Sequence, residues 1–480
     1  MLKKENQNLS KEKLLAEVER LKKELKKQKK YGLVWEEKHE EVVEMCKEKL
    51  PVLKEIKNKE IITNKDKPMN LLIEGDNYHV LSILNYTHAK KVDVIYIDPP
   101  YNTGQKDFKY NDQWVDVEDT YRHSKWLAFM EKRLVLAKNL LKNTGVIFMQ
   151  IDDNEIAQLK LLCDEIFGPN NFRNTLVWAY RTGGSPSKKD VFGRKHDYIL
   201  FYSRSDNYFF NLLKEKIYYQ KDFFGVKKDE KGNFYAEVNL RDVIEGEIEL
   251  FSKGKFYKKI NVKPVLNLSS ERVMDFPSQK PIGLVKFLLE VTTNKDSVVC
   301  DFFAGTGSTG EAVLDLNRDD NGNRKFILCT NNENNIATDI CYPRIKKSIF
   351  GFKNRPALGG NLKYFKTDFV DTEPADKNKI KLTEQATEML CVKEGTFEKV
   401  IDNEKFKIFK NSSHYTGIIW DQSAIPAFKK AIKDIKGKFS VYVFSLGDET
   451  FDDEFADVKQ RAKLSPIPEA ILKVYRRIFK

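Results

Sequence analysis

Cysteine, histidine and long apolar runs are scarce in this chain of 480 residues. The six cysteines form no CxxC pair and have no histidine at metal-ligand spacing, which argues against a disulfide framework or a zinc site. The longest apolar runs, such as residues 92–97 and 146–151, are as long as strands and far too short to cross a bilayer. No apolar segment follows the basic N-terminus as a signal peptide requires, so we expect a cytoplasmic protein with no bound metal and no membrane partner.

Basic side chains outnumber acidic ones by 83 to 71, which gives a net charge of +12. Hydrophobic residues make up 41% and charged residues 32%, as is typical of a folded globular protein. A basic chain favours a polyanionic partner, because lysine and arginine neutralise phosphates. Charge alone fits an ordinary basic protein equally well, so the partner has to be inferred from a site.

The first 60 residues differ from the rest of the chain in being rich in Lys and Glu. Leu14, Val18, Leu21 and Leu25 recur at alternating spacings of four and three, which predicts an N-terminal helical arm over residues 1–60. Two heptads are few for a coiled coil, so we expect this helix to pack on its own domain rather than to join two copies.

Two segments, residues 61–203 and 271–354, alternate short apolar runs with helical patterns, which predicts a parallel sheet with crossover helices. Between them, residues 204–270 interleave lysines with aromatic residues and break the pattern, as an inserted module does. Residues 355–480 complete the chain as a small mixed α/β unit. The strands expected in the two halves cover residues 71–73, 92–97, 146–151, 198–202, 297–303 and 325–329.

Residues 301–310 place a G-x-G-x-x-G pattern directly after a strand and before a helix. Its glycines permit close approach of the backbone to a ligand, and this pattern alone fits a dinucleotide or another adenosine-containing cofactor. S-adenosylmethionine carries an ammonium and a sulfonium, so Asp301 at the strand end suits its methionine part. Glu333, past the next strand, suits its ribose hydroxyls. The other candidate cofactor residues of this glycine loop are Phe302, Phe303, Gly305 and Gly307.

A second motif, Asp98-Pro99-Pro100-Tyr101, ends the strand at residues 92–97, at the edge where parallel sheets bind their ligands. An aromatic amine is a poor nucleophile, so its methylation requires acceptors for the N–H hydrogens. Asp98 and the carbonyl of Pro99 can accept them, because the prolines fix the backbone and remove competing donors. Tyr101 can stack on a base that has been rotated out of a duplex. These four residues are the candidate catalytic residues.

With these motifs, the chain resembles beta-class amino-methyltransferases, and specifically the modification (Mod) subunits of type III restriction-modification systems. The resemblance implies transfer of a methyl group from S-adenosylmethionine to N6 of adenine in double-stranded DNA. It also implies a homodimer, a restriction partner with helicase and nuclease activities, and a target-recognition region in the insert at residues 204–270. The motifs that carry it are residues 98–104, 151–155, 195–198, 279–281 and the glycine loop.

The fold that the resemblance implies is a circularly permuted, Rossmann-like methyltransferase sheet. In it, the strand before Asp76 lies between the strand before Glu333 and the strand before Asp98. Asp76 then accepts a hydrogen bond from the adenine amino group of the cofactor. Lys280 and Pro281 line the methionine end of the same pocket.

Other functions remain open at this point. A subunit that mainly directs a restriction partner would not need the intact tetrapeptide, and cytosine-N4 methyltransferases more often carry serine in place of Asp98. An NAD-dependent oxidoreductase would explain the glycine loop but neither the tetrapeptide nor the basic insert. Methylation of cytosine carbon 5 requires a thiolate nucleophile, and the sequence contains no Pro-Cys dipeptide.

Overall fold

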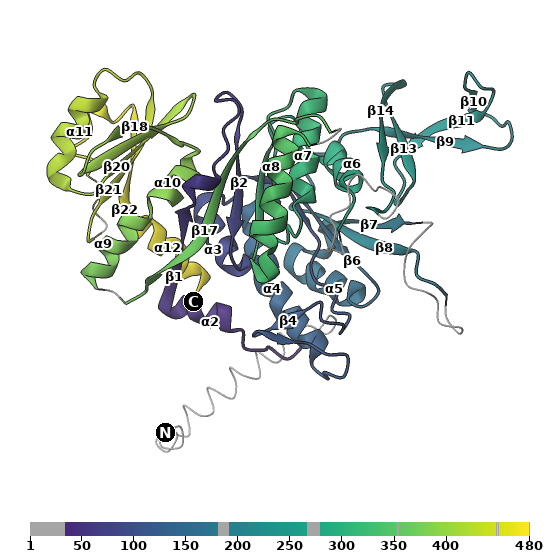
Figure 1. Cartoon of the computed structure of the whole chain (residues 1–480), viewed down its shortest axis with the longest axis horizontal. Coiled ribbons are helices and arrows are strands. Elements are labelled where there is room, and N and C mark those ends of the chain that lie inside the picture. The colour runs from purple at the N-terminus through teal and green to yellow at the C-terminus, as the bar shows by residue number, and fades with distance from the viewer. Residues whose placement is uncertain are drawn as a thin grey trace, which may run out of the picture. The chain divides into compact units, whose positions relative to one another are not determined.

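A computed structural model describes residues 34–180, 192–265, 279–352, 355–373, 375–447, 449 and 451–479. Residues 37–480 form one compact unit, whose described part contains a ten-stranded sheet, two five-stranded sheets and a short hairpin (Figure 1). Within the described ranges no helix is long and apolar enough to span a membrane, and no group of His, Cys, Asp or Glu side chains is arranged to hold a metal ion.

The ten-stranded sheet has the order β1-β17-β2-β16-β15-β3-β6-β8-β7-β12. Its strands from β17 to β6 are parallel, as the alternation of strands and helices predicts, whereas β1 and β8 run antiparallel to their neighbours. The strands are Lys49–Glu55 (β1), Asn361–Asp371 (β17), Met69–Glu74 (β2), Lys325–Thr330 (β16), Val298–Asp301 (β15), Val92–Ile97 (β3), Leu141–Ile151 (β6), His196–Ser203 (β8), Phe172–Ala179 (β7) and Val243–Glu245 (β12).

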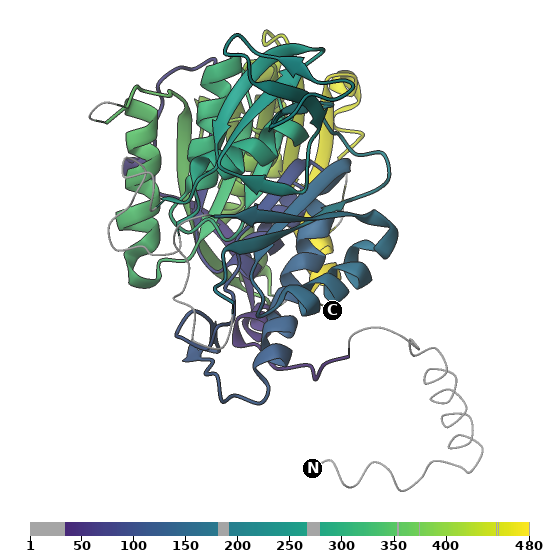
Figure 2. The same ribbon diagram turned by 90° about the vertical axis from the view of Figure 1, so that its right-hand side faces the viewer.

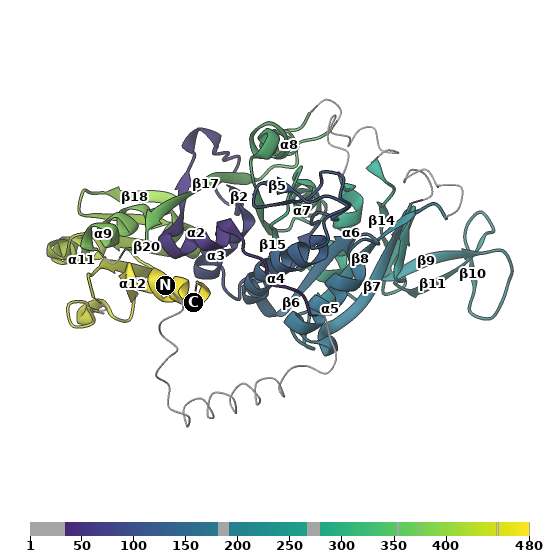
Figure 3. The same ribbon diagram turned by 90° about the horizontal axis from the view of Figure 1, so that it is seen from below.

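Helices cover both faces of this sheet (Figures 1 and 3). Apolar residues of the sheet, such as Val94 and Val299, are fully buried against helix residues such as Leu288 and Val313. The predicted α/β class is therefore confirmed. One face carries Asn77–Thr87 (α3), Arg122–Leu140 (α4) and Ile156–Phe167 (α5), and the other carries Ile282–Thr292 (α6), Ser308–Asp320 (α7) and Tyr342–Phe350 (α8).

The position expected for the strand before Asp76 was wrong. This strand, β2, lies beside β16, but on its far side, between β16 and β17. The strand of the glycine loop, β15, occupies the expected position because it pairs in parallel with both β16 and β3. Since Cys300 of β15 pairs with Ile95 of β3, the glycine loop and the tetrapeptide leave the sheet from adjacent strands.

The insert forms a five-stranded antiparallel sheet of order β10-β11-β9-β13-β14, which faces the viewer in Figure 2. Ile248, Leu250 and Ile260 of this sheet are buried and belong to the same apolar core as the central sheet. Trp178 of β7 donates a hydrogen bond from its indole N–H to the carbonyl of Val262, at 2.8 Å. The strands are Lys214–Tyr219 (β9), Lys227–Lys228 (β10), Phe234–Asn239 (β11), Glu247–Ser252 (β13) and Lys255–Asn261 (β14).

Two predicted boundaries differ from the structure. Residues 49–55, expected in the helical arm, form β1, because the apolar residues of this run are buried in antiparallel pairing with β17. β17 was expected in the C-terminal unit, but its first five residues are buried in parallel pairing with β2. Residues 1–33 of the predicted arm lie outside the described residues, and the short helix Glu41–Glu48 (α2) precedes β1.

The chain beyond β17 forms a module with a sheet of order β18-β19-β20-β21-β22 and an apolar core of its own around Ile408, Phe428 and Val441. Its last helix reaches back to the central sheet, where the hydroxyl of Tyr475 donates to the carbonyl of Pro51. The elements are Asp376–Gln385 (α9), Thr387–Glu394 (α10), Glu398–Asp402 (β18), Phe406–Lys410 (β19), His414–Ile419 (β20), Ile425–Ile432 (α11), Lys438–Phe444 (β21), Ala462–Ile467 (β22) and Glu469–Ile478 (α12).

Candidate active site

A cavity of about 630 Å³ lies where β2, β3, β15 and β16 end, and the residues after these strands line it. The structure thus gathers most of the predicted catalytic and cofactor residues in one place. Pro281, Asp301 and Gly307 are not among the lining residues. The predicted residues that line the cavity are Asp76, Asp98, Pro99, Pro100, Tyr101, Lys280, Phe302, Phe303, Gly305 and Glu333.

The carboxylate of Asp98 has one paired and one unpaired oxygen. Oδ2 accepts a hydrogen bond from the ammonium of Lys280 at 2.8 Å. Oδ1 is buried and has no hydrogen-bond partner among the described residues. Burial raises the pKa of Asp98, and the charge of Lys280 opposes this shift. An unpaired buried acceptor is costly to folding, so its retention at the cavity wall points to a ligand that donates to it.

The two prolines are held from behind by Trp126 of α4. This side chain is fully buried, and its indole N–H donates to the carbonyl of Pro100 at 2.8 Å. Because Trp126 takes up the Pro100 carbonyl, the orientation of the peptide units around Pro99 and Pro100 is fixed. Sequence analysis missed this role, since an apolar helix position carries no signal for a hydrogen bond to a loop.

Tyr101 is held at both ends. Its hydroxyl donates to Oδ2 of Asp197 at 3.3 Å, and the same oxygen accepts from the amide of Gln150 at 3.2 Å. The ammonium of Lys280 lies 4.9 Å from the centre of the Tyr101 ring. Asp197, which belongs to the motif at residues 195–198 and is only 6% exposed, therefore fixes the aromatic ring next to Asp98.

The next residue, Asn102, has a left-handed backbone (φ 56°) and a fully buried side chain. Its amide donates to Oε1 of Glu155 at 2.5 Å, and Nδ1 of His123 lies 2.6 Å from the same oxygen. Burial raises the pKa of Glu155 to about 8, and burial followed by the charge of Arg122 lowers the pKa of His123. Both shifts favour a protonated Glu155 and a neutral His123. Because Nε of Arg122 donates to Nε2 of His123 at 3.3 Å, the proton of the neutral ring is on Nδ1, which donates to Oε1 of Glu155. The motif at residues 151–155 thus anchors the loop that follows the tetrapeptide.

Asp301 supports the glycine loop from below instead of lining the cavity. Its carboxylate accepts from the hydroxyl of Thr309 at 2.5 Å and from the backbone N–H of Phe303 at 3.0 Å. Burial raises the pKa of Asp301 to about 7. Gly307 takes a left-handed conformation (φ 82°) immediately before α7, and a Cβ there would come within 3.0 Å of the sulfur of Cys341. A direct contact of Asp301 or Gly307 with a cofactor stays a prediction.

Two acidic residues line the cavity where β16 and β2 end. Glu333 pairs with Lys109 of the hairpin Lys109–Tyr110 (β4) and Gln113–Trp114 (β5), in a contact that sequence analysis missed. Asp76 caps α3 by accepting from the backbone N–H of Tyr78 at 2.7 Å, and it lies 3.5 Å from Arg133.

The insert combines exposed aromatic rings with charged side chains, several of which form ion pairs with one another. Lys227 pairs with Glu237 at 2.7 Å, and Lys259 pairs with Glu247 at 2.5 Å. These pairs reduce the positive charge available to a polyanion, and the exposed rings offer a second kind of contact on the same surface. The rings that are at least 42% exposed are those of Tyr218, Phe223, Phe224, Phe256 and Tyr257.

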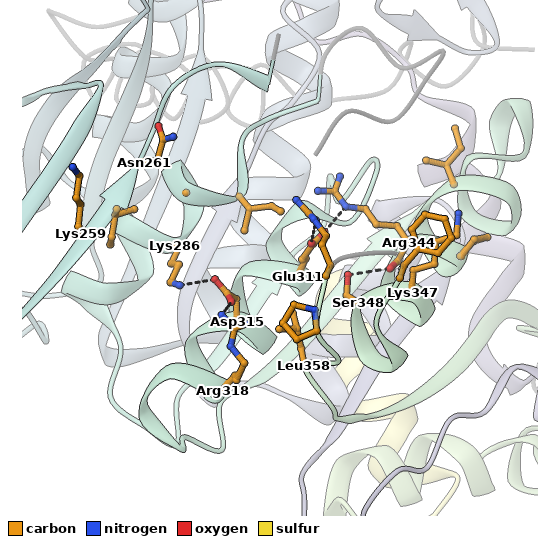
Figure 4. Close-up of a pocket in the computed structure, with 18 of the residues that line it drawn as sticks. Lys259, Asn261, Lys286, Glu311, Asp315, Arg318, Arg344, Lys347, Ser348 and Leu358 are labelled. Carbon is orange, nitrogen blue, oxygen red and sulfur yellow. Dashed lines mark hydrogen bonds and ion pairs between the residues drawn. The ribbon is translucent and has the colours of Figure 1, made fainter. Parts of the chain in front are cut away.

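A second cavity, of about 650 Å³, lies between α6, α7, α8 and β14 (Figure 4). Here the ammonium of Lys286 lies 2.5 Å from Asp315, and the carboxylate of Glu311 accepts from Arg344 at 2.8 Å and from Arg355 at 2.6 Å. Nη2 of Arg344 has no partner among the described residues. No residue expected in the site lines this cavity.

Comparison with known proteins identifies the family. Residues 92–341, just over half of the 480-residue chain, match the model of the N6/N4 DNA methylases, described as DNA methylase. The chain belongs to the DNA methylase family. The matched segment contains the tetrapeptide, the insert and the glycine loop, so the resemblance that these motifs carried is confirmed at the level of the family.

Several relatives of this DNA methylase are Mod subunits of type III restriction-modification enzymes. The StyLTI Mod subunit of Salmonella typhimurium is 31% identical over 342 residues, which cover 54% of this chain and 52% of the relative. The EcoPI Mod subunit of Escherichia phage P1 is 29% identical over 394 residues, which cover 58% and 60% of the two chains. The EcoP15I Mod subunit of Escherichia coli is 39% identical over 171 residues, which cover 31% and 26%. The chain thus spans about half the length of the first two relatives that it matches.

Proposed function

We propose that this DNA methylase transfers a methyl group from S-adenosylmethionine to N6 of adenine in double-stranded DNA. The observation that carries the proposal is the buried Oδ1 of Asp98, which has no described partner, in a residue that lines the same cavity as the glycine loop and Glu333. A carboxylate oxygen in this position accepts a hydrogen bond from an amine, and the cavity beside it can hold a methyl donor.

The cavity fits S-adenosylmethionine by size and by chemistry. A volume of about 630 Å³ lies within the range of cofactor sites. Glu333 and Asp76 at one end are acceptors for ribose hydroxyls and for an adenine amino group. Lys280 at the other end carries a charge opposite to that of a methionine carboxylate.

The side chains of the tetrapeptide would then orient and activate the target amine. S-adenosylmethionine supplies the methyl group on a sulfonium, and the neutral thioether is released when the group is transferred. Oδ1 of Asp98 and the carbonyl of Pro99 accept the two N–H hydrogens of N6, which directs the nitrogen lone pair towards the methyl carbon. Tyr101, fixed by Asp197, stacks on the extruded base. The N6 proton leaves towards Asp98 as the new C–N bond forms.

We further propose that the chain acts as the modification and recognition subunit of a type III restriction-modification system. The names of its relatives support this assignment, and so does the presence of an inserted module with exposed aromatic rings. A homodimer, a restriction partner and action in the cytoplasm, where DNA and S-adenosylmethionine occur together, belong to the same proposal. Recognition of the target sequence is assigned to the insert.

The test is methyl transfer from labelled S-adenosylmethionine to unmethylated DNA, followed by nucleoside analysis of the product. We expect N6-methyladenine with the native protein and a loss of at least about 1,000-fold in Asp98→Ala, because the amine loses its acceptor. Asp116→Ala is the matched control and should retain activity, since Asp116 is an exposed carboxylate on the same connection between β3 and α4.

Other outcomes would change the assignment. N4-methylcytosine in the product would make the chain a cytosine-N4 methyltransferase. Specific binding of DNA and S-adenosylmethionine without any methyl transfer would make it a recognition subunit that mainly directs its restriction partner.

A further inference from the structure

The ammonium of Lys280 lies against both groups that a target base would use, the carboxylate of Asp98 and the ring of Tyr101. It donates to Oδ2 of Asp98 at 2.8 Å, and it lies 4.9 Å from the centre of the Tyr101 ring. Only 9% of the Lys280 side chain and 20% of the Asp98 side chain are exposed, so the pair is largely shielded from water. In the cavity without a ligand, the positive charge of Lys280 therefore lies next to both the carboxylate of Asp98 and the ring of Tyr101.

This arrangement conflicts with chemistry at the same carboxylate. A nitrogen that gains a methyl group is cationic until it loses its proton, and an ammonium next to it raises the free energy of that cation. Burial raises the pKa of Asp98, and the charge of Lys280 opposes this rise and so weakens Asp98 as a proton acceptor. The base cannot stack fully on Tyr101 while the ammonium remains over the ring.

We propose that Lys280 is a positioning residue that gates the base site and that is drawn away from Asp98 by the α-carboxylate of the cofactor. The inference rests on the proposed function, because it requires a ligand with a carboxylate in this cavity. Lys280 thereby couples the two halves of the site: after the cofactor has bound, the carboxylate of Asp98 has no cation beside it and the Tyr101 ring becomes available to the base.

The other two cations that line the cavity, Arg133 and Lys109, are held by partners away from Asp98. Arg133 is fully buried and is held by Glu40 at 2.7 Å, and a buried pair of this kind is costly to separate. Lys109 pairs with Glu333, at the end proposed for the ribose. Lys280 lines the cavity beside Asp98, and its flexible side chain can turn between two carboxylates at little cost.

The experiment is calorimetric titration of two ligands into the native protein, Asp98→Asn, Lys280→Met and the double variant. S-adenosylhomocysteine keeps the carboxylate and lacks the sulfonium charge, whereas 5′-methylthioadenosine lacks the whole amino-acid part. We expect Asp98→Asn to bind S-adenosylhomocysteine about tenfold more tightly, because Lys280 loses its competing partner. Lys280→Met should bind it about tenfold more weakly, and 5′-methylthioadenosine should change by less than about twofold in every variant.

The double variant provides the decisive comparison. It removes both members of the pair, so no buried charge of the pair is left without its partner to destabilise the fold. Once Lys280 is replaced, Asp98→Asn should no longer tighten the binding of S-adenosylhomocysteine. Three outcomes would refute the gate. Asp98→Asn could weaken the binding of S-adenosylhomocysteine, or it could tighten this binding equally in the Lys280→Met background. It could also tighten the binding of 5′-methylthioadenosine to the same extent. A native protein that binds neither ligand would overturn the proposed function itself.

Discussion

Two cavities of nearly equal volume differ in how their charged groups are used. The cavity of Figure 4, of about 650 Å³, is enclosed mainly by helices, and its acids meet bases on neighbouring helices. The cavity at the edge of the sheet, of about 630 Å³, is enclosed mainly by the loops that follow four strands. There the buried Oδ1 of Asp98 has no described partner, and Lys280 serves both Asp98 and the Tyr101 ring.

The difference shows that volume and charge do not by themselves mark a site. The carboxylate of Glu311 accepts hydrogen bonds from two arginines, so its accepting oxygens are already paired within the fold. Removal of Glu311 should therefore mainly lower the free energy of unfolding. The partner of Glu333 is Lys109, which lies on a hairpin. The flexible side chain of Lys109 can turn to other acceptors and leave Glu333 to a ligand. Nη2 of Arg344 also lacks a described partner, so an unpaired buried atom indicates a site only where motifs such as the tetrapeptide and the glycine loop meet.

The largest effect is expected from the matched pair Glu311→Ala and Glu333→Ala. Glu311→Ala leaves the buried guanidinium of Arg344 without its carboxylate partner and should lower the free energy of unfolding by about 3 kcal/mol. Glu333→Ala removes a pair that is about one-third exposed and should cost less than about 1 kcal/mol, but it should weaken the binding of S-adenosylhomocysteine about tenfold. Denaturant unfolding and calorimetric titration measure the two quantities.

If Glu311→Ala lost ligand affinity while it kept its stability, the cavity of Figure 4 would be the functional one and the comparison would be reversed. Equal effects of both substitutions on stability and binding would mean that the two cavities are coupled through α7.

The next effect concerns pH, through Glu155 beneath the tetrapeptide. Burial raises its pKa from 4.5 to about 8 in the folded protein, so between these values the folded state holds a proton that the unfolded chain has lost. The resulting stabilisation is fully present below about pH 4.5 and is lost as the pH rises towards 8. Glu155→Gln imitates the protonated form, and it should reduce the fall in the free energy of unfolding between pH 5 and 8 by roughly 2 kcal/mol.

Unfolding by denaturant at several pH values tests this expectation, with the exposed Glu118→Gln as the control that keeps the native slope. Part of the slope should remain in Glu155→Gln, since burial also raises the pKa of Asp301 to about 7. An unchanged slope in Glu155→Gln would mean that Glu155 is ionised at neutral pH and is paired with a protonated His123.

The motifs that sequence analysis could predict are those whose chemistry is local. The tetrapeptide and the glycine loop each lie within ten consecutive residues after a strand, so turn geometry and residue type sufficed to find them. The anchors of these loops join distant parts of the chain: Tyr101 to Asp197, and Asn102 to Glu155. No single-sequence pattern indicates such contacts, because they depend on which strands become neighbours.

The same limit explains the misplaced strands. The strand β2 was assigned to its position by resemblance, whereas the order in the sheet follows from the parallel pairing of β15 with β3. Strands β1 and β17 were assigned to flanking segments because burial on both faces is not visible in short apolar runs next to charged residues. The insert was recognised by composition, but its strands carry so many lysines and aromatic residues that alternation gave no clear register.

The smallest effect is expected from Trp126→Phe, which keeps the ring buried and removes only the donor to Pro100. One lost hydrogen bond should lower the free energy of unfolding by about 1 kcal/mol. The freed carbonyl allows the peptide units of the tetrapeptide to turn, so kcat for methyl transfer should fall about tenfold, while S-adenosylhomocysteine binds within about twofold of the native affinity. Trp420→Phe, in the C-terminal module, is the matched control and should leave kcat unchanged. A loss of affinity in Trp126→Phe, with kcat intact, would show that Trp126 supports the cofactor end of the cavity and that the unpaired oxygen of Asp98 is aligned without it.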